Sequence, residues 1–299
     1  MQSIIEQSQP QQGVLKIIRA AHLGMCFGVR DAIDLALDEG SRQPLTILGQ
    51  LVHNESVIGE LRARGIGIED HPAEVKTPAV MITAHGASQK ALQRARDQGL
   101  RVLEATCPLV HRAHRAVREL MREGFHPVII GRRGHVEVRG LTEDLEEFDI
   151  VLTEEDVAGL RERAKFGIAT QTTQPIARAR QLVELIRRRF PRSEIRFVDT
   201  VCQPTKQRQA AAVELARQSD VVVVIGGATS NNTRELVATC SRYCARVHHV
   251  QTAAELNEDW LVGADTVGIT AGTSTPDWIV DGVEECIHRF ARRDLATNE

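Results

Sequence analysis

The chain alternates between short runs of aliphatic, β-branched residues and longer segments whose apolar side chains recur at helical spacing. Strand patterns lie at residues 45–48, 127–130, 166–169, 195–201, 221–225 and 266–270, and helical patterns at 89–98, 176–189, 207–218 and 233–242. The glycine-bounded segment 131–140 is expected to form a loop. Strands that alternate with helices predict parallel sheets, and the continuous run 221–225 is typical of a strand covered on both faces. The sequence therefore predicts an α/β fold with its ligand sites at the carboxyl ends of the strands.

Three cysteines stand where an apolar strand pattern gives way to a helical pattern. They are Cys26, Cys107 and Cys202, separated by 81 and 95 residues. At such a junction the backbone N–H groups and the positive end of the helix dipole favour the thiolate, which is the form that ligates metals or attacks. The nearly equal spacing predicts three similar units, with chance recurrence of ordinary α/β building blocks as the alternative.

Two further polar positions recur after each cysteine, in loops that follow predicted strands. The first lies 27 or 28 residues on, at His53, His135 and Ser230, and the second lies 59, 65 or 72 residues on, at His85, Thr172 and Ser274. These matching offsets favour similar units over chance. Glycine-bearing turns between strand and helix commonly hold phosphates, and GGATSNNT at 226–233 and TAGTSTP at 270–276 are of this type, without Walker-loop spacing.

The offsets divide the chain into three small α/β domains with parallel sheets. We place them at residues 14–106, 107–200 and 201–293, between a disordered leader at 1–13 and a tail at 294–299, and the first strand could instead join the third domain. A chain of 299 residues is long enough for three such domains.

Composition narrows the class of protein. Hydrophobic content of 42% and charged content of 26% are those of an ordinary globular protein, and a net charge of −3 predicts no nucleic-acid partner. No apolar run is long enough to span a bilayer and the N-terminal segment lacks a secretory signal, so we expect a cytoplasmic protein without a membrane association. Six cysteines in such a chain favour metal binding or catalysis over disulfides.

The cysteines at the strand ends lack C-x-x-C spacing, so they do not form a local zinc or redox motif. One cysteine from each third could converge, and three thiolates suit an iron–sulfur cluster with one iron left open for substrate. Spacing alone does not exclude the alternative that each is a small buried hydrophobe. That alternative is our prediction for Cys240, Cys244 and Cys286, which lie on helical patterns.

Several loop residues could bind a substrate or move a proton. Histidines at equivalent strand ends predict an anion site, although a lone histidine is more often structural. Glu137 follows His135 by two residues and could donate a proton if burial raises its pKa; on an open loop it would be a solvated acid. Thr172 could bind a substrate hydroxyl or cap the helix that begins near Pro175.

Nine ordered motifs resemble those of the 4-hydroxy-3-methylbut-2-enyl diphosphate reductase family, also called LytB or IspH, over roughly residues 14–290. They are GMCFGV, LVHNES, AHGAS, EATCPLV, GHVEVRG, TQTT, DTVCQPTKQRQ, SNNT and TAGTSTPDWIV. The resemblance implies a pseudo-threefold trefoil of α/β domains around a central [4Fe-4S] cluster. It also implies the last step of the methylerythritol phosphate route to isoprenoids, with a ferredoxin or flavodoxin as electron donor. That step is the reductive dehydroxylation of an allylic diphosphate to isopentenyl and dimethylallyl diphosphate.

Carried over to this chain, the resemblance assigns roles to residues. Cys26, Cys107 and Cys202 would hold the cluster, Glu137 would deliver protons, and Thr172 would orient the substrate hydroxyl. The diphosphate would be bound by His53, His85, His135, Ser230, Asn231, Asn232 and Ser274. The loop GGATS, with Ala228 and Thr229, departs from the family's GGKNS-like form, and Asn231 stands where serine or glycine is usual. A paralogue that acts on a related phosphate, and a cluster or zinc sensor with the same thiols, remain alternatives.

Overall fold

The computed structural model describes residues 15–297, with side chains through residue 292. The expected leader at 1–13 and the last two residues of the expected tail lie outside this range. Residues 294–297 continue the final helix. Within the described residues, no helix is both long enough and apolar enough to cross a membrane.

The first unit is a four-stranded parallel sheet in the order β3-β2-β4-β5. Its strands are β2 (Leu45–Leu48), β3 (Gly67–Glu69), β4 (Ala79–Ile82) and β5 (Arg101–Glu104). The helices are α1 (Phe27–Arg42), α2 (Glu55–Ala63) and α3 (Gln89–Asp97), with a 3₁₀ turn η1 (Pro72–Glu74). Alanines of α1 pack against aliphatic side chains of β2 and β4 in one core.

The second unit has the same strand order, β7-β6-β8-β9, again all parallel. Its strands are β6 (His126–Ile130), β7 (Asp149–Val151), β8 (Lys165–Thr170) and β9 (Glu194–Phe197). Its helices are α4 (Pro108–Arg122), α5 (Val136–Thr142), α6 (Glu154–Gly159) and α7 (Ile176–Arg189). The two faces of the sheet are covered by separate clusters of buried side chains, one under α6 and α7 and one under α4 and α5.

The third unit takes its edge strand from the start of the chain. Its sheet order is β1-β12-β10-β11, with β1 (Lys16–Arg19), β10 (Val221–Ile225), β11 (Val247–Val250) and β12 (Thr266–Ala271). Its helices are α8 (Gln203–Arg217), α9 (Asn231–Cys240) and α10 (Asp277–Thr297), with 3₁₀ turns η2 (Ala253–Glu255) and η3 (Glu258–Leu261). Alternate residues of β10 enter two different cores, which confirms that this strand is covered on both faces.

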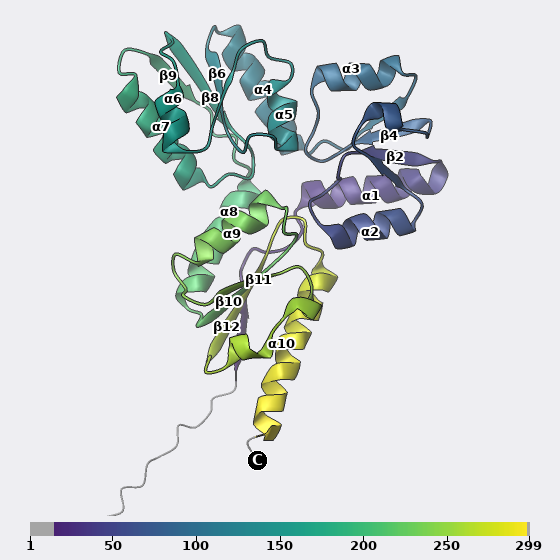
Figure 1. Cartoon of the computed structure of the whole chain (residues 1–299), viewed down its shortest axis with the longest axis vertical. Coiled ribbons are helices and arrows are strands. Elements are labelled where there is room, and N and C mark those ends of the chain that lie inside the picture. Colours follow the sequence, from purple (N-terminus) through teal and green to yellow (C-terminus); the bar gives the residue numbers. More distant parts are fainter. Residues whose placement is uncertain (1–14, 298–299) are drawn as a thin grey trace, which may run out of the picture.

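The three units are related by the way the chain passes between them. Each of the edge strands β1, β5 and β9 belongs to one sheet but leads into the first helix of the next unit, namely α1, α4 or α8. These helices contact the central strands of the unit they enter. The result is three lobes that meet at a common centre (Figure 1). The domain limits proposed from the sequence stay a prediction, but the α/β class with parallel sheets is confirmed.

Two local predictions were wrong. Residues 131–140 were expected to form a loop, but α5 begins at Val136, where the His135 ring caps the first turn. This helix has only seven residues and includes two valines, which have low helix propensity, so its sequence gives no clear helical pattern. The strand expected at 195–201 ends at Phe197, because the following residues leave the sheet to cross into the third unit.

Candidate functional site

Cys26, Cys107 and Cys202 occupy equivalent positions at the centre of the molecule. Each is the N-cap residue of the helix that enters the next unit, α1, α4 or α8, and none uses its side chain to cap that helix. The backbone N–H of each cysteine donates to a carbonyl after a central strand: Cys26 to Thr273, Cys107 to Ala84 and Cys202 to Thr172. The strand-to-helix placement predicted from the sequence is thus confirmed, and the backbone of each cysteine is hydrogen-bonded to the loop that carries a further candidate residue.

The cysteine positions approach one another closely. A Cβ added to Gly28, two residues after Cys26, would lie 2.4 Å from the Cys107 sulfur, so only glycine leaves room for that thiol. Burial raises the pKa of Cys107 and raises that of Cys202 to about 11, although hydrogen bonds at the start of each helix act in the opposite direction. The expected helix-terminus effect is therefore outweighed. A bound metal supplies the charge that deprotonates such thiols, so this donor set fits a metal centre.

A buried cation lies beside these thiols. The Arg208 guanidinium on α8 donates to the Gly24 carbonyl oxygen through Nη2 at 2.6 Å and Nε at 3.0 Å. Desolvation lowers the pKa of Arg208, whereas charge on Cys26 and Cys202 would raise it. A buried guanidinium next to two thiols favours a negatively charged group at this site, and a thiolate-ligated cluster would be such a group.

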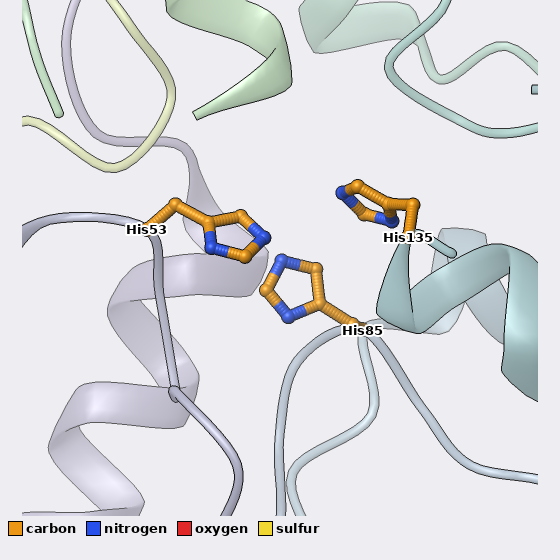
Figure 2. A group of neighbouring side chains, drawn as sticks. All are labelled: His53, His85 and His135. Atoms are coloured by element: carbon orange, nitrogen blue, oxygen red, sulfur yellow. The ribbon is translucent and has the colours of Figure 1, made fainter. Parts of the chain in front are cut away.

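Three histidines converge near the cysteines, one from each of three strand ends. His53 follows β2, His85 follows β4 and His135 precedes α5, and Figure 2 shows their rings facing a common space. Ring centroids are 4.8 Å apart for His53 and His85, 5.4 Å for His53 and His135, and 5.6 Å for His85 and His135.

The protein keeps these imidazoles neutral. Burial lowers the pKa of His53 and of His85, and lowers that of His135 to about 4, with neighbouring rings and Arg132 adding to the effect. The His135 Nδ1 accepts a hydrogen bond from the Glu137 N–H at 3.1 Å, so its Nε2 carries the proton. The His53 Nε2 is buried and has no partner within residues 15–297. An unpartnered buried nitrogen indicates a site that a polar ligand completes.

All seven residues expected to bind a diphosphate line one cavity of about 40 Å³. They are His53, His85, His135, Ser230, Asn231, Asn232 and Ser274, which come from all three units. The Asn232 Nδ2 is buried and has no partner in the described part of the chain, while its Oδ1 accepts from the Thr273 N–H at 3.0 Å. The first unit touches the third here, since the Ser274 hydroxyl donates to the His53 carbonyl oxygen at 3.3 Å. The cavity lining thus offers many hydrogen-bond donors, and it includes no carboxylate among the described residues.

Glu137 and Thr172 form a buried pair and are not part of that cavity's lining. Glu137 is only 1% exposed, and it accepts hydrogen bonds from the Thr172 backbone N–H at 2.6 Å and hydroxyl at 3.0 Å. Burial raises the pKa of Glu137 to about 7, against the lowering effect of these two bonds. A carboxyl group with this pKa can hold and release a proton at neutral pH.

The sequence reasoning missed two residues of this site. Thr173 lines the cavity and accepts from the Asn231 side chain, but a threonine beside Thr172 gave no separate signal. Arg208 does have a signal in the sequence, because it occupies an apolar-face position in the helical pattern of α8. Cys240 and Cys244 lie in the core of the third unit, which confirms that prediction.

The chain matches the family model described as LytB protein over residues 17–288. A protein of Trichlorobacter lovleyi called 4-hydroxy-3-methylbut-2-enyl diphosphate reductase is 36% identical over 271 residues, which cover 90% of this chain and 96% of that protein. A protein of Geobacter metallireducens with the same name is 35% identical, over 92% of this chain and 98% of its own length.

Solved structures show the same fold. The E-1-hydroxy-2-methyl-but-2-enyl-4-diphosphate reductase of Plasmodium falciparum is similar with a TM-score of 0.84 and 25% identity, over 91% of this chain and 87% of that chain. A structure of (E)-4-hydroxy-3-methyl-but-2-enyl diphosphate reductase, called the terminal enzyme of the non-mevalonate pathway, is similar with a TM-score of 0.67. Its identity is 35%, over 92% of this chain and 99% of that chain.

Proposed function

Because this chain belongs to the LytB protein family, we propose that it is a 4-hydroxy-3-methylbut-2-enyl diphosphate reductase that acts at the cavity between its three units. It would convert the allylic diphosphate to isopentenyl and dimethylallyl diphosphate, the terminal step of the non-mevalonate pathway. The observation that carries the proposal is the gathering of seven donor-bearing side chains from three units around one cavity beside three cysteine-capped helices.

Cys26, Cys107 and Cys202 would hold a [4Fe-4S] cluster with one iron free of protein ligands. When bound, the cluster would supply single electrons and a Lewis-acidic site for the substrate. The equivalent helix positions of the three cysteines, the buried Arg208 cation and the space that Gly28 leaves for the Cys107 sulfur support this ligand set.

The cavity residues would bind the diphosphate. Neutral imidazoles, hydroxyls and the Asn232 amide offer hydrogen bonds to phosphate oxygens, and the histidines can gain protons when the anion arrives. About 40 Å³ holds only one or two waters. The diphosphate therefore enters only after the loop at 226–230 withdraws from His53, whose carbonyl oxygen would be 2.1 Å from a Cβ added to Gly227.

Glu137 would deliver the proton that the departing hydroxyl group needs. The carboxyl group is protonated in about half of the molecules near neutral pH, and its hydrogen bonds to Thr172 fix its orientation. The Thr172 hydroxyl would orient the substrate hydroxyl by turning from Glu137 toward it. The absence of bulk water from this buried pair limits wasteful proton exchange.

Electrons would come from a ferredoxin or flavodoxin. The first residue of each cysteine-capped helix, Phe27, Pro108 and Gln203, is exposed, and the three cysteines themselves are partly buried. Arg30 and Arg112 follow within the next turn of α1 and α4, and the first turns of all three helices carry no acid. This basic, partly aromatic rim suits brief contact with an acidic electron carrier.

Two measurements test the proposal. Anaerobically purified protein should contain close to four irons and four sulfides per chain. With a reduced dye, it should convert 4-hydroxy-3-methylbut-2-enyl diphosphate to the two five-carbon diphosphates. A protein with a full cluster but without turnover would favour the sensor alternative. Turnover of a different phosphate ester in its place would favour a paralogue.

A further inference from the structure

Arg208 is a charged residue on the buried face of helix α8, whose other buried residues are uncharged. Helix α8 buries Thr205, Arg208, Ala212 and Leu215 at helical spacing, and only 7% of Arg208 is exposed. Every hydrogen bond that its guanidinium makes within residues 15–297 ends on a backbone carbonyl, those of Leu23, Gly24 and Pro204. The side chain therefore has its donors satisfied but its charge uncompensated by a carboxylate.

An uncompensated buried charge is costly, so it indicates a negative group nearby. The acidic groups that face Arg208 are the sulfurs of Cys26 and Cys202, whose charge would favour the charged guanidinium. Arg208 also fixes the turn before Cys26, because it holds the carbonyl of Gly24, a residue whose φ of +69° favours glycine. One side chain thus touches the backbone that presents one ligand and belongs to the helix that presents another.

We infer that Arg208 is a positioning residue of the iron–sulfur centre, which compensates the charge of the cluster and raises its reduction potential. This inference assumes that the centre is the [4Fe-4S] cluster of the proposed function. Each electron taken up adds a negative charge, and a buried cation stabilises that charge strongly because the local dielectric constant is low. Lys206, two residues before Arg208 on α8, is half-buried and already paired with Asp199 at 2.7 Å, so it should have little such effect.

Two substitutions separate the charge of Arg208 from its hydrogen bonds. Arg208→Gln keeps a donor for the Gly24 carbonyl but removes the charge, and Arg208→Lys keeps the charge with fewer donors. We expect the Gln variant to lower the ratio of reduced to oxidised cluster at a fixed potential at least tenfold, which is about 59 mV for one electron. The Lys variant should stay close to the parent protein, as should the control Lys206→Gln.

The measurement is a redox titration followed by electron paramagnetic resonance, with iron and sulfide determined on each sample. Equal potentials in the Gln variant and the parent at equal cluster content would overturn the inference, and so would an equal shift in Lys206→Gln. Loss of the cluster from both Arg208 variants would make Arg208 a purely structural residue and overturn it too. A parent protein without any cluster would instead remove the proposed function along with the inference.

Discussion

Replacing Glu137 by glutamine tests the proton-delivery role and the buried environment together. Glutamine has nearly the same shape, its Oε1 can accept from the Thr172 N–H, and its Nε2 can donate to the Thr172 hydroxyl oxygen. The fold should therefore persist while the ionisable proton is lost. We expect turnover to fall roughly 10²- to 10⁴-fold, the usual contribution of a positioned acid.

The same substitution should change how stability depends on pH. Burial raises the pKa of Glu137 from 4.5 to about 7, so the folded state binds its proton more tightly than the unfolded state does. The stability from this protonated carboxyl is fully present below pH 4.5 and is lost as pH rises through 7. The loss amounts to about 3 kcal/mol when complete. Glutamine does not ionise, so the variant should match the parent near pH 4.5 and be more stable than it at pH 8.

The assays are steady-state turnover with a reduced dye and thermal unfolding, each across pH 5 to 9. Parent turnover should fall as pH rises through about 7, since the acid must be protonated, and the variant should lack that dependence. Glu146→Gln, an exposed acid nearby, is the matched control and should change neither measurement. Parental turnover in Glu137→Gln, or a stability difference that is the same at pH 5 and pH 8, would refute the reasoning.

Three further outcomes are expected. The Cys202→Ser variant should contain much less iron and sulfide than the parent protein by chemical analysis. The Cys240→Ser variant, changed in the core of the third unit, should keep both, and the reverse pattern would contradict the ligand assignment. Inorganic pyrophosphate should bind with uptake of protons, and more weakly as pH rises, because the three imidazoles are neutral before it binds. Calorimetry in buffers of different ionisation enthalpy measures the number of protons taken up, and an uptake of zero would contradict the prediction. Gly227→Ala should strengthen substrate binding, by up to roughly 5- to 150-fold, because its Cβ would meet the His53 carbonyl oxygen and destabilise the closed loop by about 1–3 kcal/mol, and this loop must withdraw before the diphosphate enters. The control Gly159→Ala, whose Cβ meets nothing within 4 Å, should bind normally, and equal effects of the two would exclude the steric explanation.

Periodicity in the sequence predicted the sheets well where strands are buried on both faces. Residues 221–225 and 45–48 form strands with the expected limits, because strands buried on both faces are largely apolar. The pattern failed at α5, where a seven-residue helix carries too few turns to show a period, and the side chain that starts it is a histidine. Short helices defined by their caps lie beyond what periodicity detects.

The sequence predicted which positions of the three units are equivalent, but not how their side chains are arranged in space. The cysteine offsets located three helix N-caps correctly, since a strand-to-helix junction is a local property of the chain. The neutral state of the histidines depends on three rings from distant segments sharing one space. The raised pKa of Glu137 depends on its burial, which outweighs the hydrogen bonds from Thr172, a residue that lies 35 positions later. Long-range packing of this kind leaves no trace in a single sequence.

The pairing of β1 with β12 sets the order in which the molecule can mature. Lys16 lies opposite Thr266, so β1 must wait for a strand that lies 250 residues later in the chain before its sheet is complete. The first two sheets use strands from residues 45–104 and 126–197 and can form during synthesis, but Cys26 is placed only once the third sheet is closed. A cluster that used Cys26 as a ligand would consequently be completed only after β12 has been synthesised.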